Sequence, residues 1–241
     1  MDSRKSGRNN FKFFDKNSEV LKQQERMSMW MHKIQDAIHE DELVPYFQPI
    51  VNNTTGEVEK YECLARIIKD DEVHIPFEFI KVAEKIGLLS SITKNIINKS
   101  CKNFKDTKFD FSINITSHDL LQDYLQRYLT IKCDHYGIDH SRVVLEVLED
   151  ITSLKDDLMC EQLGKLKEAG FKIAIDDFGS ESSNFSRLLE ISPDYIKIDG
   201  SFIKDIVTDK KSLLIVKTIT AFAKESGIKV IAEYVHNEQT F

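Results

Sequence analysis

The sequence has no long hydrophobic run and no secretion signal. No stretch of the 241 residues approaches the run of about 18 apolar residues that a membrane-spanning helix needs. The segment from Met1 to Arg8 lacks the apolar centre of a signal peptide. These absences predict a cytoplasmic protein with no membrane span in this segment, although a parent protein could be attached to a membrane through other parts.

Cysteine is scarce, and basic charge is outnumbered by acidic charge. The four cysteines, Cys63, Cys101, Cys133 and Cys160, form no Cys-x-x-Cys pair, which favours free thiols in a reducing compartment over a disulfide framework or a zinc knuckle. The 33 Lys and Arg residues against 40 Asp and Glu residues leave a formal net charge of −7. That charge argues against a general DNA-binding or RNA-binding protein.

Strand-like and helical segments alternate along most of the chain. The Asn52–Gly56 turn makes the first two strands antiparallel, and the later strands are separated by helices, as in parallel sheets. The pattern predicts an α/β fold, a TIM-like (β/α)8 barrel with an antiparallel first strand, truncated before its eighth strand. Strands are predicted over residues 44–51, 60–67, 109–115, 143–148, 173–175, 195–198 and 228–232, and helices over 76–87, 91–104, 118–136, 153–169 and 212–226.

The domain plan is one barrel preceded by a helix and a short arm. Residues 18–40 repeat apolar positions at helical spacing and predict a connecting helix that packs on the barrel. The repeat is too short to sustain a coiled-coil seam, so a dimerisation helix is the weaker interpretation. Residues 41–241 form the barrel domain, and residues 1–17 form a polar, basic arm.

The stretch 171–179 places two adjacent carboxylates, Asp176 and Asp177, where a short buried strand ends. Both stay ionised most readily when a positive group lies between them. In the plain interpretation Asp177 caps the following helix and Asp176 is merely exposed. In the functional interpretation the pair belongs to a divalent-metal site at the mouth of an α/β barrel.

Other strand ends carry similar groups. A single polar residue at a strand end is more often solvated than functional, but the carboxyl ends of barrel strands meet at one rim. Carboxylate and amide oxygens suit Mg²⁺, Mn²⁺ or Ca²⁺, and a bridging Asp pair can hold two such ions for phosphodiester hydrolysis. The residues at the predicted strand ends are Glu62, Asn114, Glu146, Asp176, Asp177, Lys197, Asp199 and Glu233.

Several motifs in these strands resemble the EAL domain, the bacterial phosphodiesterase that hydrolyses cyclic di-GMP, from about Trp30 to Gln239. Glu62-Cys-Leu-Ala-Arg66 is similar to the signature Glu-Ala-Leu-x-Arg, with Cys63 in place of alanine. The other motifs are Tyr46-Phe-Gln-Pro-Ile-Val51, Asn114-Ile-Thr116, Glu146-Val-Leu-Glu149, Asp176-Asp-Phe-Gly179, Lys197-Ile-Asp199 and Ala232-Glu233. Residues 4–15 resemble the end of a GGDEF domain, which implies a GGDEF-like domain in the parent chain.

The resemblance implies a role for each matching residue in opening cyclic di-GMP to linear pGpG. Lys197 would orient or deprotonate the attacking water with Glu62 and Glu233 beside it, and two bound Mg²⁺ or Mn²⁺ ions would lower the pKa of Lys197. The resemblance also implies a homodimer. The implied metal ligands are Glu62, Asn114, Glu146, Asp176, Asp177 and Glu233; the implied substrate contacts are Gln48, Leu64, Arg66 and Asp199.

The chain departs from the family pattern around the implied site. The loop from Ser180 to Phe185 has Glu181 in place of the family's glycine, which removes access to positive φ there. Ser180 of this loop and Glu149 are further candidate site residues. Leu148 replaces a threonine, while Tyr234 and His236 replace a glycine and a glutamate. These departures keep two alternatives open: a catalytically weak or inactive EAL domain that acts as a cyclic di-GMP receptor, and a scaffold that binds only a protein.

Overall fold

The computed structural model describes residues 19–149, 157–180, 185–238 and 240. The predicted arm at residues 1–17, with its GGDEF-like resemblance, lies outside the described residues, as do residues 181–184 of the divergent loop. The helices are α1 (Glu19–His39), α2 (Pro76–Lys85), α3 (Leu89–Phe104), α4 (Ser117–Leu120), α5 (Leu125–Tyr136), α7 (Asp157–Glu168), α8 (Phe185–Ile191), α9 (Gly200–Lys204) and α10 (Lys210–Glu225). The strands are β1 (Leu43–Val51), β2 (Val58–Lys69), β3 (Glu72–His74), β4 (Asp110–Asn114), β5 (Val143–Leu148), β6 (Lys172–Phe178), β7 (Tyr195–Ile198) and β8 (Lys229–Ala232).

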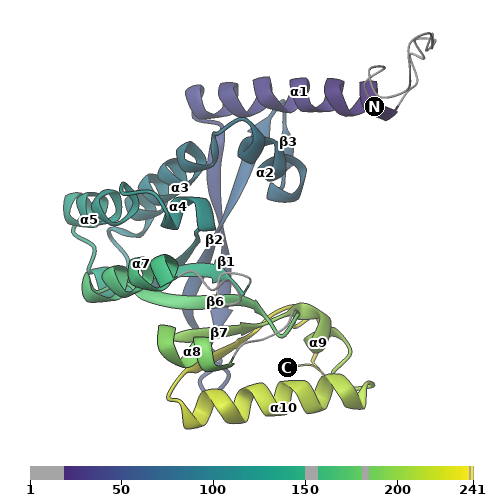
Figure 1. Ribbon diagram of the computed structural model, residues 1–241, viewed down its shortest axis with the longest axis vertical. Helices are drawn as coiled ribbons and strands as arrows, with labels where there is room; N and C mark the ends of the chain where they lie inside the picture. Colours follow the sequence, from purple (N-terminus) through teal and green to yellow (C-terminus); the bar gives the residue numbers. More distant parts are fainter. Residues whose placement is uncertain (1–18, 150–156, 181–184, 239, 241) are drawn as a thin grey trace.

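The strands form one curled sheet in the order β1-β2-β4-β5-β6-β7-β8, with β3 added beside β2 (Figure 1). The pair β1–β2 is antiparallel, and the pairs from β2–β4 to β7–β8 are parallel, which confirms the α/β class and the antiparallel first strand. Within the described chain β1 and β8 do not pair with each other, so the sheet is open along this seam. Short β3 was not predicted.

The outer face of the sheet carries the main hydrophobic core. Strand β5 shows why: Val143, Leu145 and Val147 point to the helix-covered side, and Val144 points to the inside of the curl. Because both faces of such a strand are covered, it is an almost continuous apolar run, and Glu146 stands out within it. The polar residues on the inner face therefore gather where the strands end.

The predicted helix at 118–136 is wrong in one respect, because it is two helices. Thr116 and Asp119 form a capping box that closes the single turn of α4, and α5 begins at Leu125. The short helices α8 and α9 were not predicted either. Helix α9 begins because Asp199 accepts a hydrogen bond from the Ser201 backbone at 2.7 Å.

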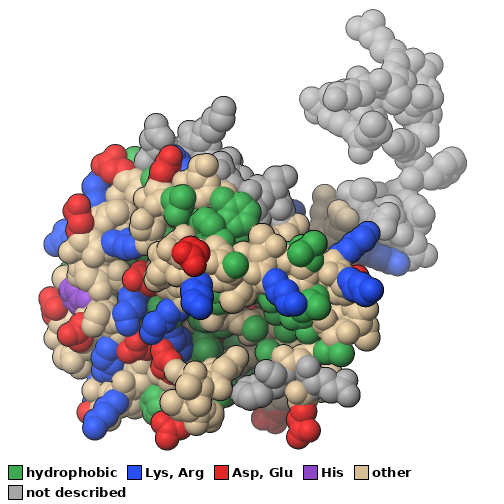
Figure 2. Space-filling model, turned by 90° about the horizontal axis from the view of Figure 1, so that it is seen from below, with side chains coloured by type: hydrophobic (Ala, Val, Ile, Leu, Met, Phe, Trp, Pro, Cys, Tyr) green, Lys and Arg blue, Asp and Glu red, His purple; other side chains and the backbone are tan. Residues whose placement is uncertain are grey.

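Helix α1 lies across β2, β3 and α2 at one end of the molecule (Figure 1). Trp30, Ile34 and Ala37 of α1 are buried, and the Trp30 ring meets the His74 ring edge-on at 5.1 Å. At the opposite end, α10 exposes Leu213, Leu214 and Ile215. From this side, Figure 2 shows hydrophobic side chains interspersed with lysines. Among the described helices, none combines the length and hydrophobicity needed to cross a membrane.

Candidate functional site

The amine of Lys197 lies at the centre of an acidic cluster at the carboxyl ends of the strands. Lys197 is 2% exposed, and its Nζ lies 2.7 Å from Glu146 Oε2, 2.9 Å from Glu233 Oε1, 3.0 Å from Asp176 Oδ1 and 3.2 Å from Glu62 Oε2. These four carboxylates come from β5, the end of β8, β6 and β2. The parallel register thus brings side chains up to 171 positions apart in the sequence (233 − 62) onto one amine.

The cluster has more negative than positive charge. Together with Asp177, five carboxylates face one ammonium, a formal charge of −5 + 1 = −4. Burial raises the pKa values of Glu146 and Glu233, and the neighbouring Lys197 opposes this effect. Burial alone would lower the pKa of Lys197, but the charges of the surrounding carboxylates outweigh it and raise that pKa. Further positive charge would therefore be accommodated favourably here.

A bulge in β6 turns both adjacent aspartates toward the cluster. Successive side chains of a regular strand point to opposite faces. The β6–β7 pairing shifts between Ile175 and Phe178, and Asp177 adopts a positive φ of 53°. Asp177 N donates a hydrogen bond to Asp176 Oδ1 at 3.0 Å. Burial raises the pKa of Asp177, and the charges of Asp176 and Asp199 add to that effect.

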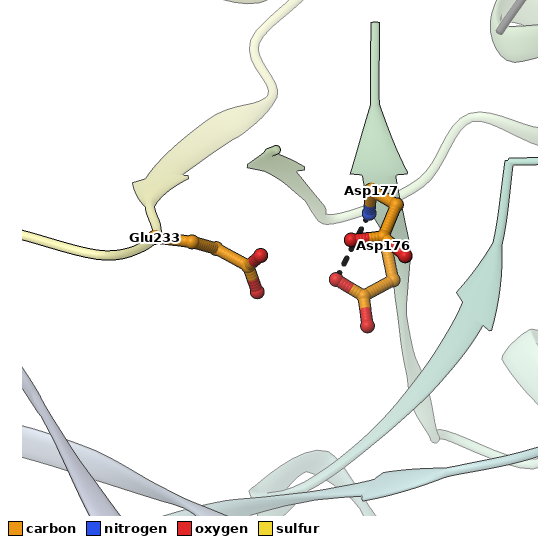
Figure 3. Close-up of side chains that lie close together, drawn as sticks. All are labelled: Asp176, Asp177 and Glu233. Carbon is orange, nitrogen blue, oxygen red and sulfur yellow. Dashed lines mark hydrogen bonds between the residues drawn. The ribbon is translucent and has the colours of Figure 1, made fainter. Parts of the chain in front are cut away.

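Three of the carboxylates are close enough to hold one metal ion. Ligand oxygens of Asp176, Asp177 and Glu233 all lie within 4.8 Å of one another. Figure 3 shows Glu233, beyond the end of β8, pointing toward the two aspartates at the end of β6. A set of carboxylate oxygens with an excess of negative charge suits a hard divalent cation and does not suit a thiolate-seeking metal.

Asn114 and Glu62 complete the set of predicted ligands at this rim. Asn114 Nδ2 donates to Glu62 Oε1 at 3.0 Å, and Asn114 pairs with Glu146 in the β4–β5 register. All six predicted ligands thus lie on, or directly after, strands whose ends converge on one place. Rotation of the Asn114 amide by half a turn would present its oxygen to the cluster in place of the nitrogen.

Glu149 and Ser180 support the aspartates from behind. Glu149 is 3% exposed and accepts a hydrogen bond from the Gly179 backbone at 2.9 Å, while its own amide donates to the Asp176 carbonyl at 3.1 Å. The exposed Ser180 donates its amide to the Asp177 carbonyl at 3.3 Å. Both residues therefore fix the backbone that carries the two aspartates.

Two cavities meet at Glu62 and Leu64. One, of about 720 Å³, lies along the open seam between β1 and β8 and is lined by Gln48, Lys197 and Glu233 among others. The other, of about 610 Å³, is largely apolar and lies between β2, β4, α2 and α3. The acidic cluster therefore lies between the two cavities, which share Glu62 and Leu64 in their walls.

Helix α2 lines the second cavity, and the prediction of site residues missed it. Pro76, Ile80 and Glu84 face this cavity. Their spacing of four residues places them on one side of a helix, and that spacing was the available signal. The exposed Leu148, which takes the place of a threonine in the family pattern, also lies in this wall.

Two predicted substrate contacts are not brought to these cavities. Arg66 donates from Nη1 to the Ala65 carbonyl at 2.7 Å, and its guanidinium lies 5.7 Å from the Tyr46 ring centroid. Asp199 caps α9. Neither residue lines either cavity.

Tyr234 and Gly200 form a close contact beside Glu233. Tyr234 adopts a positive φ of 55°, where the family pattern has glycine, and the residue is 62% exposed in the wall of the first cavity. A Cβ atom at Gly200 would lie 2.8 Å from the Tyr234 Cβ, so only glycine fits there. No pattern in the sequence predicted this contact.

Comparison with curated proteins finds relatives that align with nearly the whole chain. Cyclic di-GMP phosphodiesterase PdeB of Shewanella oneidensis is 30% identical over 240 residues, which is 97% of this chain and 28% of the relative. Signaling protein YkoW of Bacillus subtilis is 33% identical over 227 residues, 92% of this chain and 28% of the relative. The chain therefore spans less than a third of the length of either relative.

Comparison with solved structures shows the same fold. The PaMucR phosphodiesterase in complex with c-di-GMP has a TM-score of 0.82 and 25% identity, over 88% of this chain and 89% of that one. The FimX EAL domain from Pseudomonas aeruginosa bound to c-di-GMP has a TM-score of 0.78 and 23% identity, over 88% and 87%. The EAL domain family profile matches residues 31–241. The chain belongs to the EAL domain family.

Proposed function

We propose that this chain hydrolyses one phosphodiester bond of cyclic di-GMP and releases linear pGpG, with two Mg²⁺ or Mn²⁺ ions as cofactors. The observation that carries the proposal is the cluster of five carboxylates, one amide and one lysine between two cavities. The relatives named as cyclic di-GMP phosphodiesterases support the substrate and the reaction. The negative charge of the cluster supports the divalent ions, since two of them would add +4 and balance its formal charge of −4.

The residues of the cluster would bind the two ions and position the attacking water. Glu62, Asn114, Glu146 and Asp176 would hold one ion, and Asp176, Asp177 and Glu233 the other. When bound, such ions lower the pKa of a coordinated water and offset charge on the phosphate. Lys197 would orient that water and hold or accept its proton; its ion pairs with Glu146, Asp176 and Glu233, the proposed ligands of the two ions, support this role.

The two cavities give the dinucleotide room on either side of the cluster. Leu64, in the walls of both, and Gln48, in the first, would contact a guanine or a ribose. Arg66 would reach a phosphate only after its guanidinium leaves the Ala65 carbonyl. Asp199 would act on the substrate indirectly, through its charge beside Asp177.

One observation favours the alternative of a cyclic di-GMP receptor without turnover. Lys197 already pairs with four carboxylates, so the cluster is partly neutralised by the protein's own cation. A domain in that state could bind the dinucleotide in the flanking cavities without metal ions and without cleaving it.

A hydrolysis assay separates the two functions. We would incubate cyclic di-GMP with the wild type, Glu62→Gln and Lys197→Met, with and without Mg²⁺ or Mn²⁺, and separate the products by chromatography. Glu59→Gln is the matched control, since Glu59 lies on the same strand but pairs with Asn52 and Lys229 away from the cluster. Linear product that needs metal, and that only the wild type and the control form, supports the enzyme. Tight binding without product under any condition supports the receptor, and no binding refutes both.

We also propose that the parent protein places a GGDEF-like domain before α1 and that the domain forms a homodimer. In this plan residues 1–17 are the remnant of that domain, 18–40 the linker helix and 41–241 the EAL barrel. The exposed Leu213, Leu214 and Ile215 on α10 support a self-association surface. Light scattering of the wild type and Leu214→Glu tests the dimer, which the substitution should weaken.

A further inference from the structure

We infer that Asp119 is a positioning residue that holds the Asn114 amide at the acidic cluster. The inference rests on the proposed function in one respect, since Asn114 serves there as a metal ligand. Asp119 itself reaches neither the cluster nor either cavity, and it acts through the turn that follows β4.

The Asp119 carboxylate is fully buried and accepts five hydrogen bonds. Oδ1 accepts from Tyr124 Oη at 2.5 Å and from Ser90 Oγ at 3.2 Å. Oδ2 accepts from Thr116 Oγ1 at 2.7 Å, Thr93 Oγ1 at 2.8 Å and Thr116 N at 3.3 Å. Within the described chain no lysine or arginine pairs with it, so hydrogen bonds alone offset the cost of burying this group.

The network fixes the backbone directly beyond Asn114. Thr116, two residues after Asn114, is held by Asp119 through both its backbone and its hydroxyl, and it accepts from the Asp119 amide at 3.2 Å. Between them, Ile115 N donates to the Glu146 carbonyl at 2.8 Å. Asn114 is therefore the last residue of β4 before a turn that is anchored on both sides, and its amide reaches Glu62 at 3.0 Å.

The extent of this network exceeds what capping α4 requires. Helix α4 has four residues. Asp209, which caps the 16-residue α10, accepts only local bonds, from Lys211 N, Ser212 N and Ser212 Oγ. Asp119 instead joins α3, the β4–α4 turn and the segment before α5. Because Thr93 and Thr116 also line the second cavity, the network fixes the cavity wall that adjoins Asn114.

The test compares Asp119→Asn with Asp209→Asn as a matched control. Both variants keep side-chain volume and remove one carboxylate cap, but only Asp119 lies behind Asn114. Tyr124→Phe removes only one hydrogen-bond donor to Asp119, and it replaces Asp119→Asn as the test variant if Asp119→Asn folds poorly. The direct readout is the ¹⁵N side-chain amide signal of Asn114 in the metal-free protein, assigned by its loss in Asn114→Ser. The second readout is the Mn²⁺ dissociation constant from calorimetric titration, with melting temperature recorded for every variant.

We expect Asp119→Asn, and to a smaller degree Tyr124→Phe, to shift or broaden the Asn114 signal and to weaken Mn²⁺ binding about tenfold, as loss of a ligand-orienting partner does. Asp209→Asn should lower the melting temperature and leave both readouts unchanged. An Asn114 signal that is unaffected in both Asp119→Asn and Tyr124→Phe, or that moves equally in the control, overturns the inference. A wild type that binds no Mn²⁺ refutes the metal role of Asn114 instead, and the amide signal still decides the role of Asp119.

Discussion

Replacing Lys60 by methionine should stabilise the protein at neutral pH. Lys60 lies on the inner face of β2 and is 2% exposed. Within the described chain its Nζ has no hydrogen-bond partner and lies 3.3 Å from the centroid of the Tyr195 ring. A methionine of similar length would fill the same space without a charge to desolvate.

The structure sets the size of the effect. Burial lowers the pKa of Lys60 from 10.5 to about 8, against the opposing charges of Glu59 and Asp110. A difference of this size corresponds to a folding penalty of about 3 kcal/mol for the protonated amine. Contact between the protonated amine and the Tyr195 ring offsets about 1–2 kcal/mol of this penalty. Lys60→Met should therefore raise the free energy of unfolding by about 1–2 kcal/mol near pH 7.

The pH dependence follows from the same pKa. Below pH 8 the amine is protonated in both states and the native state bears the whole penalty. Between about pH 8 and 10.5 the native state loses its proton first, so the unfolded state binds more protons and wild-type stability rises with pH. Because this gain amounts to about 3 kcal/mol in total, the advantage of Lys60→Met should shrink over this range and reverse at its upper end.

Urea unfolding at about pH 7 and about pH 9.5 measures both effects. The control is Lys172→Met, because Lys172 pairs with Asp110 at 2.9 Å and is partly exposed. It should leave stability unchanged or lower it by up to about 1 kcal/mol. A Lys60→Met variant less stable than the wild type at pH 7, or with the same pH profile, would refute the reasoning.

Two further predictions concern the cluster and its surroundings. Gly200→Ala should lower the free energy of unfolding by about 1–3 kcal/mol, because its Cβ would meet the Tyr234 Cβ at 2.8 Å. Adding Tyr234→Gly should recover most of that loss in thermal unfolding. Independent, additive effects of the two substitutions would count against the contact. Lys197→Met should lower the free energy of unfolding in EDTA by about 3–5 kcal/mol, since it leaves four carboxylates without their shared cation. Mild acidification should recover part of this loss by protonating carboxylates whose pKa values are raised, and equal stability of both proteins at neutral pH would show that the lysine does not neutralise the cluster.

The sequence predicted most strands because each is a buried apolar run bounded by turn residues. Strand β7 matches the predicted range 195–198, and β5 matches 143–148. The break between α4 and α5 was missed because apolar periodicity continues across it. The carboxylate of Asp119, in the capping box that begins α4, bonds to Ser90 and Thr93 on another helix, and periodicity carries no information on such partners.

The candidate site was predictable to the extent that it follows from strand ends. Parallel strands of one sheet must end at the same rim, so Glu62, Asn114 and Glu146 were expected together. The bulge that turns Asp177 inward depends on the pairing of β6 with β7, which no local pattern specifies. The side-chain direction of Arg66 depends on a rotamer choice, and the structure shows it bonded to its own strand.

The carboxylates around Lys197 explain why its pKa is raised here, although a lowered pKa was expected beside metal ions. Four carboxylates within 3.2 Å of one amine favour its protonated form. Two divalent ions on the same carboxylates would offset most of the negative charge around Nζ, and the amine would then release its proton more readily. In the proposed function Lys197 would therefore stabilise the cluster without metal and act as a base when the ions are bound. The two proposed functions, receptor and hydrolase, differ in which cation neutralises the carboxylates.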